Sequence, residues 1–143
     1  MKKNILYIII TALLFFSGGF LIGKMTSETI TREIKIGVEN GENSGQVDYK
    51  KIITDAQNQV IIDNIMMIYL QSIPTENTEI NMNRPDLFIE MSSPKQSTGL
   101  IDSKVWFTDE GAIIGNRASE SWENVEYRSI NQAAADYIKN LIE

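Results

Sequence analysis

The 143-residue chain contains neither cysteine nor histidine. The lack of cysteine excludes disulfides and also excludes attachment of a lipid to an N-terminal cysteine. The lack of histidine excludes the usual catalytic triads and, together with the lack of cysteine, nearly all zinc sites. We therefore predict no catalytic residue, no cofactor and no metal site, and we expect that the protein is not an enzyme.

Charged side chains are absent from a long apolar run near the N-terminus, Ile5–Ile22, whose sequence is ILYIIITALLFFSGGFLI. Eighteen helical residues are about 27 Å long, close to the thickness of the hydrocarbon core of a bilayer. We predict that residues 1–24 form a cytoplasmic tip and a single transmembrane anchor. The alternative is a secretory signal cleaved after Gly19, in which case the protein is secreted.

The charges on either side of this run predict its orientation. Lys2 and Lys3 precede it, whereas all the acidic residues of the chain follow it, so the positive-inside rule predicts a cytoplasmic N-terminus and an extracytoplasmic C-terminal domain. Residues 25–143 carry 10 basic and 19 acidic side chains, a formal charge of −9. Nucleic acid is unsuited to such a surface, because its affinity depends on neutralising phosphates. We expect contact with the lipid bilayer through residues 5–22 and with a protein partner at the cell surface.

A GxxxG pattern, Gly19 to Gly23, lies at the end of the apolar run. This pattern lets two membrane helices approach closely, although glycine is also common in membrane helices without such a role. A structural spacer that dimerises through Gly19 and Gly23 is therefore one alternative function.

The segment after the run is poor in packing residues. Met25–Lys35 has the composition of an extended stretch, and Gly37–Gly45 (GVENGENSG) is rich in glycine and polar residues, as in flexible linkers. We predict that residues 25–49 form an extended segment and a flexible acidic linker. Residues 50–143 then form the extracytoplasmic domain.

Two helices are predicted in this domain. A capping-box pattern, T-x-x-Q from Thr54, precedes apolar residues at helical spacing and predicts a helix from about Asp55 to Ser72, buried on much of its circumference. An S-x-x-Q pattern from Ser129 precedes a second apolar helical face and predicts a helix from about Asn131 to Ile142.

Between the helices the hydrophobic period changes to two, which is typical of strands. The predicted strands lie near Leu87–Met91, 101–107, 112–114 and Trp122–Arg128, with a hairpin turn at 109–111. In the last strand we expect Val125 and Tyr127 to face inward. This order predicts an α+β fold, in which two helices pack on one face of a small antiparallel sheet.

Aromatic side chains beside charges provide the candidate binding residues. Trp106 lies on the same strand face as Lys104, and Trp122 is expected to share a face with Arg128. Exposed tryptophan next to charge is typical of recognition surfaces, so we predict that these four residues bind a partner. The alternative is that a helix or the loop Ser92–Gly99 covers the tryptophans, because most tryptophans are largely buried.

The C-terminal part of the chain resembles the small YhfM-like membrane-associated proteins of Gram-positive bacteria. The resemblance covers about Lys50–Ile142 and is carried by the order of five short motifs: Pro85-Asp86-Leu87, Val105-Trp106-Phe107, Asp109-Glu110-Gly111, Glu126-Tyr127-Arg128 and Tyr137-Ile138-Lys139. It implies a membrane-associated extracytoplasmic domain of uncharacterised role, and it supplies no catalytic residues.

These features together predict a membrane-anchored extracytoplasmic interaction domain whose sheet surface binds a protein partner. A hydrolase is the alternative from another class; it would rely on carboxylates alone and act on a cell-wall or peptide substrate.

Overall fold

The computed structural model describes residues 7, 9–19, 30–42, 45–76, 79–119 and 121–142. These residues include an α+β domain built on one seven-stranded sheet, in which every neighbouring pair of strands is antiparallel. The predicted α+β class and the antiparallel sheet are confirmed.

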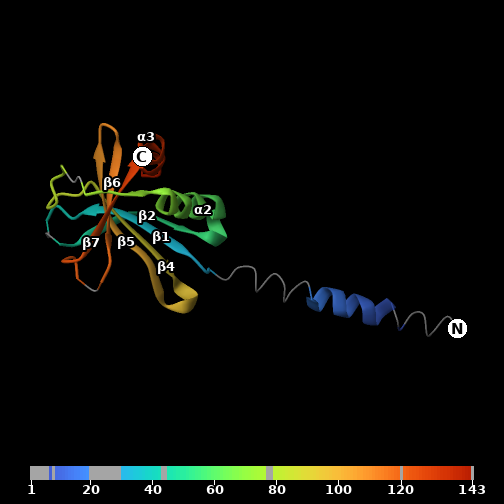
Figure 1. Ribbon diagram of the computed structural model, residues 1–143. Helices are drawn as coiled ribbons and strands as arrows, with labels where there is room; N and C mark the ends of the chain where they lie inside the picture. The colour runs from blue at the N-terminus through green and yellow to red at the C-terminus, as the bar shows by residue number, and fades with distance from the viewer. Residues whose placement is uncertain are drawn as a thin grey trace.

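The strands are β1 (Glu33–Glu39), β2 (Val47–Thr54), β3 (Ile73–Pro74), β4 (Leu87–Ser93), β5 (Thr98–Thr108), β6 (Gly111–Arg117) and β7 (Val125–Asn131). The domain helices are α2 (Asp55–Gln71), the short 3-10 helix η1 (Pro94–Gln96) and α3 (Gln132–Asn140). The spatial order of the strands is β2-β1-β4-β5-β6-β7-β3, and α2 and α3 lie on the same side of the sheet (Figure 1).

The hydrophobic core lies between the two helices and one face of the sheet. The alternation predicted for Leu87–Met91 is confirmed, since β4 alternates strictly between buried and half-buried residues. The helices contribute Ile62 and Ile65 from α2, and Ala135 and Ile138 from α3. The sheet contributes its inward side chains to the same cluster: Ile34, Ile36, Ile53, Leu87, Ile89, Met91, Val105, Ala112, Ile114 and Ile130.

The N-terminal apolar run is only partly described. Tyr7 and residues 9–19 are helical, whereas residues 1–6, 8 and 20–29 lie outside the described residues. No helix within the described part of the chain is both long and apolar enough to cross a bilayer. The transmembrane helix over Ile5–Ile22 therefore stays a prediction.

The boundary predicted at residue 50 does not coincide with an edge of the sheet. Part of the predicted extended segment and linker is instead in the sheet, because Glu33–Glu39 and Val47–Thr54 pair with one another as β1 and β2. β1 also pairs with β4, so it lies inside the sheet and its Ile34 and Ile36 are fully buried. Only the connection between the two strands has the loop character expected of the glycine-rich stretch.

The predicted start of α2 is confirmed. Thr54 caps the helix: its side chain accepts a hydrogen bond from the Gln57 N–H, and the Gln57 side chain accepts one from the Thr54 N–H. The prediction that this helix is buried on much of its circumference is wrong. Only Ile62 and Ile65 are fully buried, while Val60 and Leu70 remain 65% and 73% exposed.

The C-terminal elements differ from the prediction in two details. The N-cap of α3 is Asn131, whose side chain accepts from the Ala134 N–H, and not Ser129. Val125 and Tyr127 face away from the helices, because their strand partners, Arg117 and Gly115, lie on the opposite sheet face from the buried Ile114.

The hairpin between β5 and β6 is as predicted. Gly111 follows the turn at Asp109 and Glu110 and has a φ of +147°, in the region that favours glycine. A Cβ atom at this position would lie 2.0 Å from the Ile130 carbonyl oxygen, so the close approach of β6 to β7 also requires glycine.

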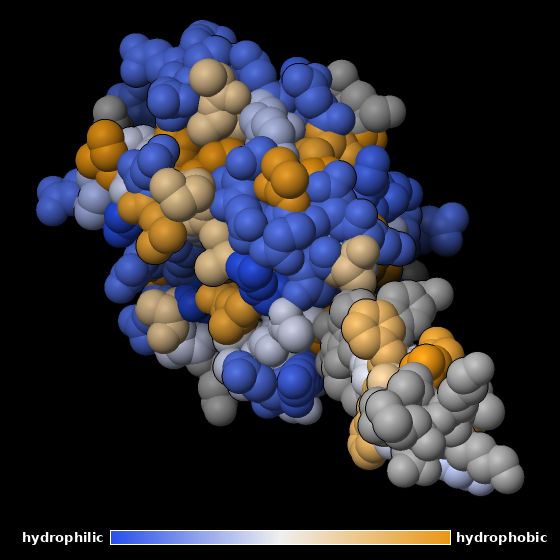
Figure 2. Space-filling view, turned by 90° about the vertical axis from the view of Figure 1, so that its right-hand side faces the viewer, coloured by the Kyte–Doolittle hydropathy of each residue, from blue (hydrophilic) through white to orange (hydrophobic). Residues whose placement is uncertain are grey.

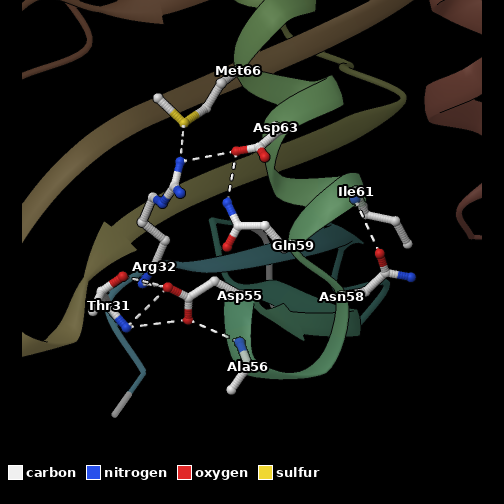
Figure 3. Close-up of polar contacts among 9 residues, drawn as sticks. All are labelled: Thr31, Arg32, Asp55, Ala56, Asn58, Gln59, Ile61, Asp63 and Met66. Carbon is white, nitrogen blue, oxygen red and sulfur yellow. Dashed lines mark hydrogen bonds and ion pairs between the residues drawn. The ribbon is translucent and has the colours of Figure 1, made fainter. Parts of the chain in front are cut away.

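A polar clamp fixes the start of β1 to the start of α2 (Figure 3). The Asp55 carboxylate accepts hydrogen bonds from the Thr31 N–H at 3.1 Å, the Arg32 N–H at 3.1 Å and the Thr31 hydroxyl. Arg32 in turn forms an ion pair with Asp63, which lies eight residues after Asp55 in α2. The chain therefore enters the sheet at a defined point beside the N-terminus of α2.

Candidate functional site

The sheet face opposite the helices, called the open face below, carries a charged row across four strands. The register places Lys35 of β1 beside Glu90 of β4, and Glu90 beside Asp102 of β5. The Lys35 Nζ lies 3.5 Å from the Glu90 Oε1, and Arg117 of β6 forms an ion pair with Asp102. Two acids therefore stand side by side in the middle of the row, with a cation on the outer side of each.

This arrangement changes the acidity of two groups. Partial burial raises the pKa of Asp102 above its ordinary value and the charge of Glu90 adds to the shift, although Arg117 and Lys104 oppose it. Burial also raises the pKa of Tyr49 to about 12, helped by its hydrogen bond to Glu90. The Tyr49 hydroxyl donates to the Glu90 Oε2 at 2.7 Å, so at neutral pH the phenol stays protonated and holds the carboxylate in position.

A second row on the open face combines aromatic rings with a cation. Phe88 of β4, Lys104 of β5 and Gly115 of β6 are direct cross-strand neighbours. The Lys104 Nζ lies 4.4 Å from the centroid of the Trp122 ring and 5.9 Å from that of Phe88. The Arg117 guanidinium lies 5.6 Å from the same Trp122 centroid, so two cations contact this indole.

Members of these two rows, other than Lys35, Gly115 and Arg117, line a hollow of about 300 Å³, which we call the open-face groove. Its floor and walls include Tyr49, Phe88, Glu90, Asp102, Lys104 and Trp122. Connections between strands add to its rim: Gly45 from the β1–β2 hairpin, and Asn83 and Pro85 from the segment before β4. The groove therefore combines rigid strand residues with loop residues, as many binding sites do.

Trp106 lies on the open face, as predicted, but it is buried beneath a loop. Its indole N–H donates to the Asn81 carbonyl at 2.9 Å, and only 4% of the residue is exposed. The Trp106 ring also packs against the Tyr127 ring, with 6.2 Å between the two centroids. Gly115 lies beside the Trp106 ring, where a larger side chain would crowd it. The covering segment precedes β4 and is neither a helix nor the loop Ser92–Gly99 of the predicted alternative.

Trp122 and Lys104 come together in the groove, whereas Arg128 does not join them. Trp122 lies in the turn before β7, not in the strand, and is half-buried. Arg128 lies on the helix side of the sheet, where its Nε donates to the Ser72 hydroxyl at 2.6 Å. Its guanidinium also donates to the Ser72 carbonyl, so Arg128 holds the C-terminal end of α2 against β7.

Of the two glycines of the GxxxG pattern, only Gly19 is among the described residues. Gly19 belongs to the helical residues 9–19, and no atom lies within 4 Å of the position that a Cβ would occupy. Gly23 lies outside the described residues.

The groove has the chemistry of a binding site. Its acids are engaged by Lys35, Arg117 and Tyr49, and its aromatic rings offer flat apolar surface beside charge. Among the residues that the structure describes, no group of three or more acidic side chains is arranged to hold a metal ion.

Sequence reasoning missed several residues in and beside the groove, although a signal for some of them exists. The alternation of β4 and β5 places Phe88 and Glu90 on the same face as Lys104, as the sequence pattern suggests. Tyr49 and Arg117 join them only through the pairing of β2 with β1 and of β6 with β5, and cross-strand register depends on tertiary packing.

Compared with protein-family models, curated proteins and solved structures, the chain shows no significant match.

Proposed function

We propose that this protein is a membrane-anchored extracytoplasmic interaction domain that binds a protein partner through the open-face groove. The observation that carries the proposal is the half-buried Trp122, held between Lys104 and Arg117 at the rim of a preformed groove. Tryptophan and arginine are the residue types that most often dominate the energy of protein–protein interfaces.

The anchoring part of the proposal is supported by the N-terminal helical residues. Phe15 and Phe16 are 79% and 81% exposed, and apolar side chains gather on this segment at the lower right of Figure 2. The Thr11 and Ser17 hydroxyls donate to carbonyls one turn earlier, at Tyr7 and Leu13. A helix that satisfies its polar groups internally and exposes its apolar side chains is suited to lipid.

The choice of a protein partner follows from the balance of charges in the groove. Side chains of both signs lie beside aromatic rings, which suits a mixed protein surface. The exported part of the chain carries a formal charge of −9, from 10 basic and 19 acidic residues, which disfavours polyanions.

The proposal can be tested with the full chain, tagged and crosslinked in native membranes before purification. We expect Trp122→Ala to reduce the recovery of a specific partner by about tenfold or more, because an interface anchor contributes at least about 2 kcal/mol. Val60→Ala, on the exposed side of α2, is the matched control and should leave recovery unchanged. Equal recovery of the partner with both variants would contradict binding through the open-face groove.

A carboxylate-dependent hydrolase is a second candidate, because Glu90 and Asp102 are direct cross-strand neighbours in the groove. Two neighbouring carboxylates can serve as acid and base. This candidate predicts that Glu90→Gln abolishes hydrolysis of a cell-wall or peptide substrate while the fold is retained. The binding proposal predicts no hydrolysis by the wild-type protein in the same assay.

A further inference from the structure

We infer that the partner presents an acidic side chain to Lys104 in the open-face groove; this inference rests on the proposed function and names the chemistry that the groove recognises. Lys35 and Arg117, the other cations of the open face, are already paired with acids, Lys35 with Glu90 and Arg117 with Asp102. Lys104 differs from them: within the described part of the chain, its ammonium has neither an ion pair nor a hydrogen-bond acceptor.

The position of Lys104 suits it to bind an acceptor from a ligand. Its backbone lies on β5, in the interior of the sheet, so the side chain starts from a rigid support. The ammonium is held over the Trp122 ring, 4.4 Å from its centroid, and the residue as a whole is half-buried. An aromatic face attracts a cation but does not accept hydrogen bonds as an oxygen does, so three donors remain for a ligand. A carboxylate from the solvent side supplies those acceptors in a charge-assisted bond.

Charge balance in the groove selects the kind of anion. Glu90 and Asp102 lie next to Lys104 on the open face, and Asp102 precedes it by two residues on the same strand face. A ligand with several negative charges would be repelled by Glu90, by Asp102 and by Glu39, the third acid of the groove lining. A single carboxylate can instead pair with the Lys104 ammonium, which forms no ion pair with the residues that the structure describes. Trp122 and Phe88 offer apolar surface to the methylene groups of a glutamate or aspartate.

An acidic side chain fits better than the carboxylate of a chain end. Chain ends are usually held where several backbone N–H groups converge. Around Lys104 the groove is formed by side chains of β4 and β5 and by the Trp122 ring, and the backbone groups of both strands face their neighbouring strands in the sheet. The occupant is therefore a partner segment with a glutamate or aspartate that projects into the groove beside Trp122.

Selection from a library of random peptides, each fused at its C-terminus to a carrier, tests this inference on the full chain in detergent micelles. The fusion leaves only side-chain carboxylates available. We expect the wild type to select peptides rich in glutamate and aspartate, and Lys104→Glu to select peptides rich in lysine and arginine. Lys104→Met, which keeps the apolar stem, should weaken the acidic peptides by about tenfold. Lys139→Met is the matched control, because Lys139 also lies over a ring, at 6.0 Å from Phe107.

The outcomes separate the two proposals. If the selected peptides depend on Trp122 but lack acidic residues, or bind Lys104→Met as tightly as the wild type, the acidic ligand is excluded while the groove remains the binding surface. If Trp122→Ala binds every selected peptide as well as the wild type does, both the groove and the acidic ligand are excluded. Circular dichroism of each variant verifies that its fold is retained.

Discussion

The two tryptophans of the open face differ because of what covers each ring. Trp106 is buried under the segment before β4, while Trp122 stays half-buried and contacts Lys104 and Arg117. Strand alternation predicted the face of Trp106, since alternation is a local property of the chain. The covering loop was not predictable from the same pattern, because the Asn81 carbonyl approaches the indole over 25 residues of sequence.

Gly115 makes room for Trp106. A Cβ atom at this position would lie 3.0 Å from the Trp106 ring and 2.9 Å from a Val125 methyl group. We expect Gly115→Ala to lower the free energy of unfolding by about 1–3 kcal/mol, because the ring has to shift in a packed environment. Gly99→Ala, in a strand position with no atom within 4 Å, should change it by less than about 0.5 kcal/mol. Urea denaturation measures both; equal effects would contradict the proposed packing.

Asp55 gives the clamp at the start of β1 a defined pH dependence. Partial desolvation opposes the shift, but hydrogen bonds from Thr31, Arg32 and Ala56 lower the pKa of Asp55. The folded-state pKa lies below the unfolded value of about 3.9, so the stabilisation is present above that value and is lost as the pH falls through the folded pKa.

We therefore expect Asp55→Asn to be less stable than the wild type at pH 7, with a difference that shrinks once the pH falls below about 4. Chemical denaturation across this range measures the difference. Asp109→Asn is the control, since this acid lies in the exposed turn between β5 and β6. A stability difference for Asp55→Asn that is constant with pH would show that the charge of the clamp is not involved.

At the scale of elements, α2 shows what local sequence determines. The capping box at Thr54 and Gln57 is formed by residues three apart, so it was predicted and is present. The buried side of the helix was predicted poorly, because apolar residues occur around most of its circumference. Only contact with the sheet selects Ile62 and Ile65 for the core and leaves Val60 and Leu70 exposed.

This difference around α2 predicts unequal effects of truncation. Ile62→Ala should lower the free energy of unfolding by about 2–5 kcal/mol, because it removes a fully buried side chain and leaves a cavity. Val60→Ala should change it by no more than about 0.5 kcal/mol. Thermal and urea denaturation test the pair, and a large cost at Val60 would indicate that this side of the helix is covered by another part of the molecule.

The β1–β2 hairpin was not predictable from local sequence, in contrast to the start of α2. The stretch Gly37–Gly45 has a linker composition, which concealed the strands on either side of it. Ile34 and Ile36 have the alternation of a strand, but pairing with β4, more than 50 residues away in sequence, is what makes β1 an interior strand. The groove residue Tyr49 was missed for the same reason, because it reaches the open face only through this hairpin.

At the scale of the whole molecule, the clamp at Asp55 restricts where the domain sits if residues 5–22 span the bilayer as proposed. Eight residues, 23–30, lie between that span and Thr31, and even a fully extended connection from Ile22 to Thr31 is no longer than about 32 Å. The start of β1 and the N-terminus of α2 would therefore remain near the membrane surface. The open-face groove would then be presented to a partner that is itself held at, or close to, the outer face of the membrane.

The most direct test of the central claim is a photocrosslinking map of the full chain in native membranes. A photoreactive amino acid is placed in turn at Val47 and Asn83, two groove-lining positions that leave Trp122 and Lys104 in place, and at Val60 and Leu70 on the exposed side of α2. The account predicts that the groove positions crosslink to the same protein partner and that the α2 positions do not. Crosslinks from α2 alone, or equal yields from both surfaces, would contradict it.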